Sequence, residues 1–315
     1  MQEQTSTAVQ PKQKRRAKAK PKPTTFIDPF VDFAFKRLFA SNESKPILIG
    51  LLNQIFKGRK YITAINYGKN EHPGENFKER GVVFDVTCTD ADGSNFIIEV
   101  QRASQEFFID RALYYASKAI TEQAVKVKGK KWNYKLKEVY VVSFLENFRL
   151  PNTLPSAYVH DICLTNRYTG KIFYDKMGLI FIEMLSFVKS PIELETDLDK
   201  WLYALKHLTE FKERPPYLNG SEFDPLFDLA NYANLNEEER NMYNDSLKYK
   251  WDNENVMDYA IKTAKQEGEQ KARVEERAKA LEEKREIARE MLADNEPIEK
   301  IIKYTKLSLA EIQAL

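Results

Sequence analysis

Residues 80–101 read RGVVFDVTCTDADGSNFIIEVQ, and this stretch decides the fold of the chain. Both of its arms, 82–89 and 95–100, are rich in β-branched and aromatic residues, which favour strands. The three residues between the arms, 91–93, end in Gly93, which adopts the left-handed backbone of such a loop at little cost. The stretch is therefore predicted to form a β-hairpin.

The loop makes Asp90 and Ser94 the closing pair, so Asp85 is expected directly opposite Glu99. Because side chains alternate along a strand, Gln101 should lie on the same face as Glu99. Two carboxylates that face each other across a ladder repel unless a positive charge lies between them. A divalent cation such as Mg²⁺, which prefers oxygen ligands, is the simplest candidate.

A cation of this kind polarises a phosphoryl group and orients water, which points to phosphoryl chemistry. The alternative is that both acids simply face solvent on a one-sided sheet. Phe84, Val86, Ile98 and Val100 can fill the other face as core, so this pattern alone permits both interpretations.

The composition is that of an ordinary globular protein. The chain has 315 residues, of which 43% are hydrophobic and 30% charged, enough for one sizeable core plus appendages. Cys88 and Cys163 are too few for a disulfide framework or a zinc site, which favours a reducing cytoplasm. No secretory signal is visible, and the longest apolar stretch, 177–188, is interrupted by Glu183 and too short to span a membrane.

Residues 1–25 form a basic leader. They carry a net charge of +6, which leaves −4 for the rest because the whole chain has +2. This leader contains three prolines and no apolar periodicity, so it is predicted to be disordered. It could contact nucleic acid electrostatically or act only as a solubilising segment.

Residues 26–214 are predicted to form one α/β domain. Its expected helices are 30–39 (with Asp28 as cap), 44–56, 105–127 and 197–210. Its expected strands, besides the hairpin, are 61–67, 137–144, 156–164 and 180–184, with turns at 167–171 and 175–178. The near-continuous apolar run 137–144 is typical of a central strand covered on both faces.

Two of these helices carry candidate functional residues. Asp32 and Lys36 share a face at i, i+4, which alone indicates a surface ion pair. Phe108, Arg111, Tyr115 and Lys118 lie close to one stripe of the helix 105–127. Such a stripe is usually core, but Arg111 and Lys118 could reach a phosphate.

The C-terminal third is predicted to be all helical. It divides into a helical extension (215–262), a charged single helix (263–293) and a small two-helix motif (294–315) in which Ser308 caps the last helix. The motif is reminiscent of half a helix-turn-helix. Self-association or binding of a protein partner is a further expectation for these helices.

Several short motifs follow one another along the chain in a characteristic order and spacing. They are Asp32-Phe-Ala-Phe-Lys36-Arg-Leu-Phe39, Phe84-Asp85-Val86, Asp92-Gly93, Ile98-Glu99-Val100-Gln101, Arg111-Ala-Leu-Tyr-Tyr115, Ile182-Glu183, Trp201 and Thr305-Lys-Leu-Ser-Leu-Ala-Glu-Ile312. Together they resemble the PD-(D/E)XK nuclease superfamily, in particular its recombination-promoting nuclease (Rpn) or transposase branch. The resemblance covers residues 26–315.

This resemblance implies an α/β fold, with a mixed central β-sheet flanked by helices and an all-helical C-terminal extension. It also implies an endonuclease that depends on Mg²⁺ or Mn²⁺ and acts on DNA, in recombination or in a mobile element. Asp85 and Glu99 would be metal ligands, with Asp32 as an auxiliary acid.

The superfamily usually has a lysine where this chain has Gln101. Gln101 would hydrogen-bond the attacking water, while Lys36, or else Lys118, would supply the missing positive charge. Arg111 and Lys118 would bind substrate phosphates. The three histidines are expected to have no catalytic role: His72, His160 and His207.

Two alternatives remain open. One is a catalytically degenerate nuclease fold that serves as a DNA-binding or scaffold protein, suggested by Gln101 and the long charged helix. The other is a nuclease directed to RNA. The argument against it is that the sequence shows no aromatic stacking platform typical of RNA-binding proteins.

Overall fold

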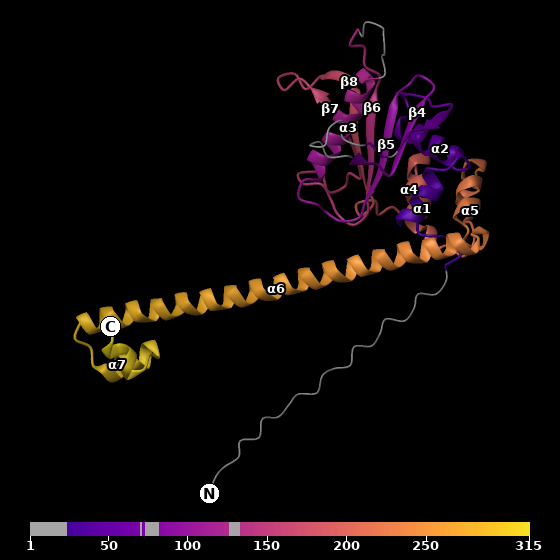
Figure 1. Cartoon of the computed structure of the whole chain (residues 1–315). Coiled ribbons are helices and arrows are strands. Elements are labelled where there is room, and N and C mark those ends of the chain that lie inside the picture. Colours follow the sequence, from indigo (N-terminus) through magenta and orange to yellow (C-terminus); the bar gives the residue numbers. More distant parts are fainter. Residues whose placement is uncertain (1–23, 70, 73–81, 126–132) are drawn as a thin grey trace. The chain divides into compact units, whose positions relative to one another are not determined.

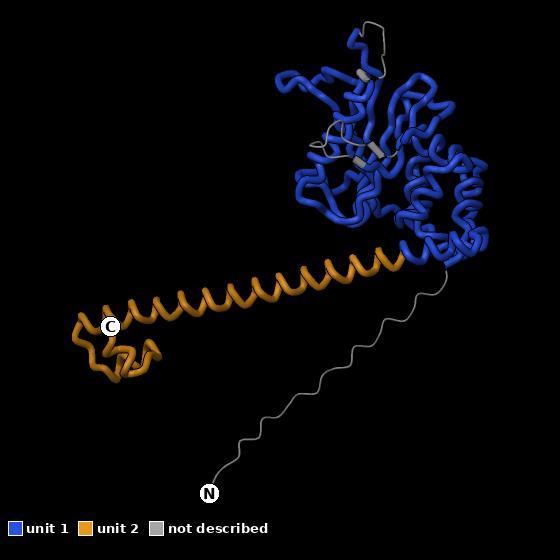
Figure 2. The backbone as a smooth tube through the Cα atoms, viewed as in Figure 1, with its two compact units in different colours: residues 1–246 blue, residues 247–315 orange. Residues whose placement is uncertain are grey.

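A computed structural model describes residues 24–69, 71–72, 82–125 and 133–315. The chain divides into two compact units, residues 1–246 and residues 247–315 (Figure 2). Nearly all of the predicted basic leader lies outside the described residues.

The elements follow one another as mixed strands and helices, then helices alone (Figure 1). The strands are β1 (Ile65–Tyr67), β2 (Glu71–His72), β3 (Val82–Val83), β4 (Val86–Asp90), β5 (Asn95–Gln101), β6 (Val139–Leu145), β7 (Val159–Thr165) and β8 (Ile172–Glu183). The helices are α1 (Asp32–Phe39), α2 (Lys45–Ile55), α3 (Phe108–Val125), α4 (Asp197–His207), α5 (Asp224–Ala230), α6 (Glu237–Ala293), α7 (Ile298–Thr305) and α8 (Leu309–Gln313). Short 3-10 helices lie at Pro191–Glu193, Leu208–Glu210, Pro216–Leu218, Ser221–Phe223 and Tyr232–Asn234.

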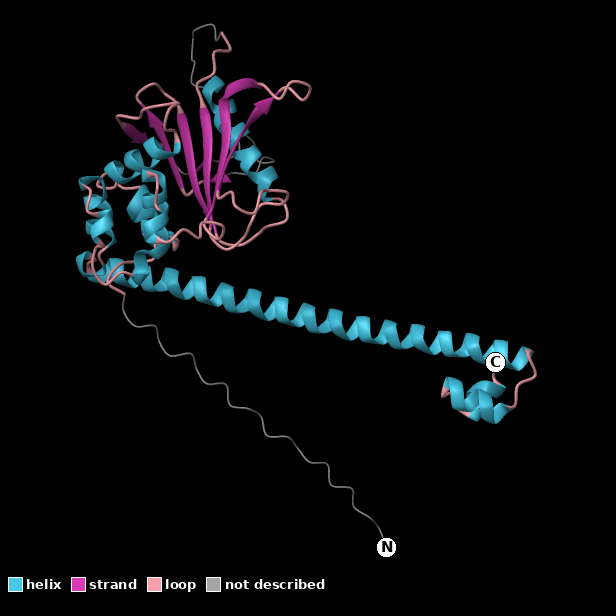
Figure 3. Cartoon of the chain, turned by 180° about the vertical axis from the view of Figure 1, so that it is seen from behind, coloured by secondary structure: helices cyan, strands magenta, loops and turns pink. Residues whose placement is uncertain are grey.

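Six strands form one mixed sheet in the order β1-β4-β5-β6-β8-β7. Strands β5, β6 and β8 are parallel, whereas β1, β4 and β7 pair antiparallel with their neighbours. Every residue of β6 is buried, as predicted for a central strand covered on both faces. The predicted fold class, a mixed sheet flanked by helices, is confirmed (Figure 3).

One face of the sheet packs against α3. Val139 and Val141 of β6 join Ala112 and Ala116 of α3 in one buried cluster, which also contains Phe84 from the predicted hairpin. Small alanines on this side of α3 let the helix approach the sheet closely, so the helix is held directly above β5 and β6.

The other face packs against α1 and α2 through the alternate side chains of β6. The Phe144 ring lies 6.3 Å from Phe35 and 6.4 Å from Phe39, centroid to centroid, both on α1. Tyr140 lies 4.6 Å from Phe56, which directly follows α2. Because side chains alternate along β6, one set of them packs against α3 and the other set packs against α1 and α2.

The hairpin forms as predicted. Gly93 has a φ of 84°, and the Asp90 N–H donates to the Ser94 carbonyl at 3.1 Å. Val86 pairs with Ile98 and Cys88 with Phe96, which is the expected register. The first arm differs in one respect, because it is interrupted at residues 84–85 between β3 and β4.

Several predicted boundaries are wrong. Helix α1 begins at Asp32 rather than at residue 30, because the Asp28 carboxylate caps a preceding turn by accepting from the Phe30 N–H at 2.9 Å. The first strand covers only Ile65–Tyr67 of the expected 61–67. The helix expected from residue 105 begins as α3 at Phe108.

The turn predicted at 175–178 is also wrong, because β8 runs without a break from Ile172 to Glu183. Its glycine has a packing role instead: a Cβ on Gly178 would lie 2.9 Å from Cδ1 of Tyr140 on the neighbouring strand. A strand glycine of this kind marks close approach rather than a turn. The turn predicted near 167–171 is present, with Gly170 at φ 67°.

Helix α6 begins in the first unit and ends in the second, and the predicted boundary at 262/263 falls inside it. In the second unit, the end of α6 packs with α7 and α8 around Ala288, Ile301, Leu307 and Ile312. Ser308 caps α8 as predicted. No helix among the described residues is long and apolar enough to cross a membrane.

Phe144→Ala is expected to lower the free energy of unfolding by about 3–5 kcal/mol, because it empties a fully buried site between α1 and the sheet. Urea denaturation followed by circular dichroism measures the change. Phe173→Ala, on β8 with the side chain 80% exposed, is the control and should change the free energy by less than about 0.5 kcal/mol. Equal losses in both variants would contradict this packing scheme.

Candidate active site

Asp85 and Glu99 lie side by side where the hairpin is interrupted. The register of β4 and β5 continues to place Asp85 opposite Glu99. Glu99 Oε1 accepts a hydrogen bond from the Asp85 backbone N–H at 3.1 Å. In the other direction, Asp85 Oδ2 accepts from the Val100 N–H at 2.9 Å. Each carboxylate is thus held by the backbone of the strand that carries the other.

Burial makes this pair electrostatically costly. Glu99 is only 9% exposed, and burial raises the pKa of its carboxyl to about 8, with the neighbouring Asp85 adding to the rise. Burial likewise raises the pKa of Asp85, with a further upward contribution from Asp32. The pair therefore resists carrying two negative charges at neutral pH and offers oxygen donors to a cation.

Arg111 brings positive charge to the pair from α3. Its guanidinium donates to Oε1 of Gln101 and to Oε1 of Gln105. It lies 5.8 Å from the Tyr115 ring centroid, and its charge lowers the pKa of both Asp85 and Glu99 against the effect of burial.

Gln101 is engaged at both ends. While Oε1 accepts from Arg111, Nε2 donates to the Ala103 carbonyl at 2.7 Å. The expected role of Gln101 in orienting a water thus competes with its observed role, which is to position Arg111. The second role could not be predicted from the sequence, because local patterns do not show which strand residue meets which helix residue.

Asp32 and Lys36 form an ion pair on α1, with 2.9 Å between Oδ1 and Nζ. Both also act electrostatically on Asp85, Asp32 raising its pKa and Lys36 lowering it. Asp32 is not grouped with Asp85 and Glu99 as a third metal ligand. Among the described residues, no three His, Cys, Asp or Glu side chains are gathered so that they could hold a metal ion. The Asp32 carboxylate is instead engaged by Lys36, one helical turn further along α1.

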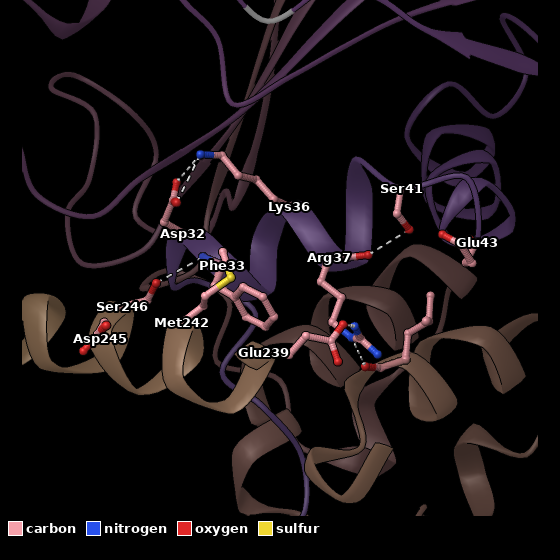
Figure 4. Close-up of a pocket in the computed structure, with 11 residues that line it drawn as sticks. Asp32, Phe33, Lys36, Arg37, Ser41, Glu43, Glu239, Met242, Asp245 and Ser246 are labelled. Atoms are coloured by element: carbon pink, nitrogen blue, oxygen red, sulfur yellow. Dashed lines mark hydrogen bonds and ion pairs between the residues drawn. The ribbon is translucent and has the colours of Figure 1, made fainter. Parts of the chain in front are cut away.

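An open pocket of about 860 Å³ borders this ion pair (Figure 4). In Figure 4 the side chains of Asp32 and Lys36 point toward each other, and Arg37 pairs with Glu239 of α6. The pocket is lined by four acids and two bases, so it is poorly suited to a phosphate. The residues predicted to bind phosphate, Arg111 and Lys118, lie on α3 instead.

Two further residues of the predicted stripe, Lys118 and Tyr115, lie on α3. Lys118 is half-buried, seven residues after Arg111. Tyr115 is half-buried, and burial raises its pKa, with Glu99 and Asp85 adding to the rise.

The two histidines whose side chains are described each lie beside a glutamate. His160 Nε2 is 3.2 Å from Oε1 of the buried Glu183, and His207 pairs with Glu210 at 2.9 Å. Glu183 also accepts from the Leu150 N–H at 2.8 Å, which indicates a structural role at the end of β8. The side chain of His72 lies outside the described residues.

A mixed sheet with two acids at the open end of a hairpin, faced by a helix that carries arginine, is typical of a nuclease of the PD-(D/E)XK class. The comparison with family models agrees: the model of the PD-(D/E)XK nuclease family transposase matches residues 29–260. The chain therefore belongs to this family. No curated protein and no solved structure matches it significantly.

Glu99→Gln is expected to stabilise the protein in the absence of divalent metal, and increasingly so as the pH rises from about 5 to 8. The folded-state pKa of Glu99, about 8, lies above its ordinary value of 4.5, so ionisation is harder in the folded state than in the unfolded one. The wild type therefore loses stability across this interval, and a neutral amide does not.

Thermal unfolding in EDTA at a series of pH values measures the difference. Glu193→Gln is the control, because the side chain of Glu193 is exposed and its hydrogen bonds with Ser190 lower its pKa. A constant difference between Glu99→Gln and wild type over this pH range would contradict the electrostatic interpretation.

Proposed function

We propose that this protein is a metal-dependent DNA endonuclease that hydrolyses phosphodiester bonds with Asp85 and Glu99 at its centre. The observation that carries the proposal is the opposed, buried pair of carboxylates in a member of a nuclease family. The transposase description of the family supports a role in recombination or in a mobile element. Cys88 and Cys163 are both free thiols, in keeping with the proposed cytoplasmic location.

The residues present fit a hard divalent cation. Two carboxylates that resist joint ionisation supply oxygen donors, which Mg²⁺ and Mn²⁺ accept. Asp85 and Glu99 would hold the ion, and Asp32 could contribute if its pair with Lys36 opened. A bound cation of this type polarises phosphoryl oxygens and lowers the pKa of a bound water.

The cationic side chains of the chain would do the rest. Arg111, oriented by Gln101, would contact the phosphate and stabilise the charge that develops on it. The positive charge of Lys36 lowers the pKa of Asp85. Lys36 would therefore contribute the positive charge that the superfamily usually places at the position of Gln101. Lys118 would bind a phosphate further along the strand.

Asp85→Asn and Glu99→Gln are each expected to reduce nicking of supercoiled plasmid in Mg²⁺ or Mn²⁺ by about 100-fold or more, because several kcal/mol of charge stabilisation is lost. The amides keep the hydrogen-bond acceptors that hold the two backbones together. The control is Asp175→Asn, an exposed acid on β8, which should cleave at the wild-type rate. Undiminished cleavage by both site variants would refute the assignment.

Mn²⁺ affinity is expected to rise about tenfold per pH unit from pH 6 to pH 8 and then level off, because Glu99 must release its proton before it binds the metal. Isothermal titration calorimetry in buffers of different ionisation enthalpy measures both the affinity and the proton released. Glu99→Gln should bind more weakly and without this dependence on pH. A flat profile for the wild type would argue against Glu99 as a ligand.

A second candidate is a non-enzymatic DNA-binding or scaffold protein on the same fold. It is favoured by the engagement of Gln101 at both ends and of Asp32 with Lys36. This candidate predicts salt-dependent retention of DNA, reduced by removal of residues 1–25, with no metal-dependent cleavage. The plasmid assay therefore separates the two candidates.

A further inference from the structure

Two aromatic side chains on the solvent side of α3 have no place in the core. Phe107, one residue before α3, is 65% exposed, and Tyr114 is 47% exposed. By contrast Phe108, Ala112 and Ala116, on the sheet side of the helix, are at most 5% exposed. The spacing within residues 105–127 predicts a stripe of Phe108, Arg111, Tyr115 and Lys118, and it does not single out Phe107 or Tyr114.

Phe107 and Tyr114 share one stripe with the two basic residues of α3. The Arg111 N–H donates to the Phe107 carbonyl at 2.9 Å, so the helical hydrogen-bonding pattern already includes Phe107. Residues 107, 111, 114 and 118 are therefore spaced i, i+4, i+7 and i+11, which aligns them along the helix. We call Phe107, Arg111, Tyr114 and Lys118 the α3 stripe. In it, aromatic and basic side chains alternate.

The α3 stripe continues into the candidate active site through Arg111. The same guanidinium that belongs to the stripe donates to Gln101, two residues after Glu99 on β5. A polynucleotide whose phosphodiester reaches Asp85 and Glu99 therefore passes next to Arg111. Its adjoining nucleotides then meet the aromatic rings, while Lys118 lies along the backbone path.

We propose that Phe107 and Tyr114 stack on unpaired bases, and that the protein acts on single-stranded or locally unpaired DNA. The inference rests on the proposed function and names the substrate class of the same site. Exposed rings alternating with cations suit a strand that offers both base faces and phosphates. In a duplex the base faces are already stacked on one another, so the rings would find no partner there.

Binding of short oligonucleotides tests the proposal. The full-length protein in EDTA is titrated into fluorescein-labelled 12-nucleotide oligothymidylate, a 12-base-pair duplex, or 12-nucleotide oligouridylate, and anisotropy is measured. The variants are Phe107→Ala, Tyr114→Ala, the double variant and the milder Phe107→Leu. Leu113→Ala is the matched control, because Leu113 is also on α3 and 46% exposed but lies off the stripe.

Each alanine is expected to weaken binding of the single-stranded DNA by about tenfold, and the double variant by about 100-fold. Duplex affinity should change less than about twofold in every variant, and Leu113→Ala should leave both probes at wild-type affinity. Phe107→Leu, which keeps an apolar side chain but no ring, should resemble Phe107→Ala. Oligouridylate should bind more weakly than oligothymidylate and still lose affinity in the double variant.

Parallel losses on duplex and single strand would overturn the proposal, as would a loss in Leu113→Ala equal to that in the stripe variants. Unchanged DNA binding together with loss of self-association in the double variant would assign the stripe to a second copy and also overturn it. Tighter binding of oligouridylate than of oligothymidylate would refute DNA as the substrate. Because this readout needs no cleavage, its failure is distinguishable from failure of the plasmid assay.

Discussion

The repulsion between two buried carboxylates is the constraint on which the rest of the site depends. A hairpin with fixed register brings Asp85 and Glu99 together, and the surrounding core removes the water that would screen them. The sheet could have avoided this cost with apolar residues at both positions. The two acids at these positions, with Arg111 near them, lower the local stability, which is consistent with the proposed role of the pair in holding a cation.

The helices around the sheet make sense in relation to this constraint. The alanines of α3 that face β6 hold the helix close enough for Arg111 to act on both acids. On the opposite face, aromatic rings of α1 pack against Phe144 and fix the helix that carries Asp32 and Lys36. Each helix thus has one side that belongs to the core and another that contributes charge.

Much of this could be predicted from the sequence, because the decisive features are local. The loop ending in Gly93 sets the register, and the register alone determines that Asp85 opposes Glu99. The apolar run of β6 likewise indicates a central strand. What could not be predicted depends on partners distant in the sequence. Gly178 was taken for a turn because the Tyr140 ring on the next strand is invisible in a linear pattern.

The same limit applies to the candidate site. Spacing along a helix shows which residues share a stripe, but not which side of the helix meets the sheet, so the exposure of Phe107 and Tyr114 could not be predicted. Nor does it show that Gln101 accepts a hydrogen bond from Arg111. Such pairings depend on how α3 packs against β5, which is tertiary structure and cannot be read from local spacing.

The interrupted strand gives Asp85 a second function, with a consequence for how this fold evolves. Its side-chain oxygen occupies the place of a main-chain acceptor for the Val100 N–H, in the gap between β3 and β4 where the regular pairing with β5 stops. A carboxamide could fill that place equally well. One substitution could therefore remove the proposed cation ligand while leaving the architecture intact, so that the fold does not depend on the proposed activity.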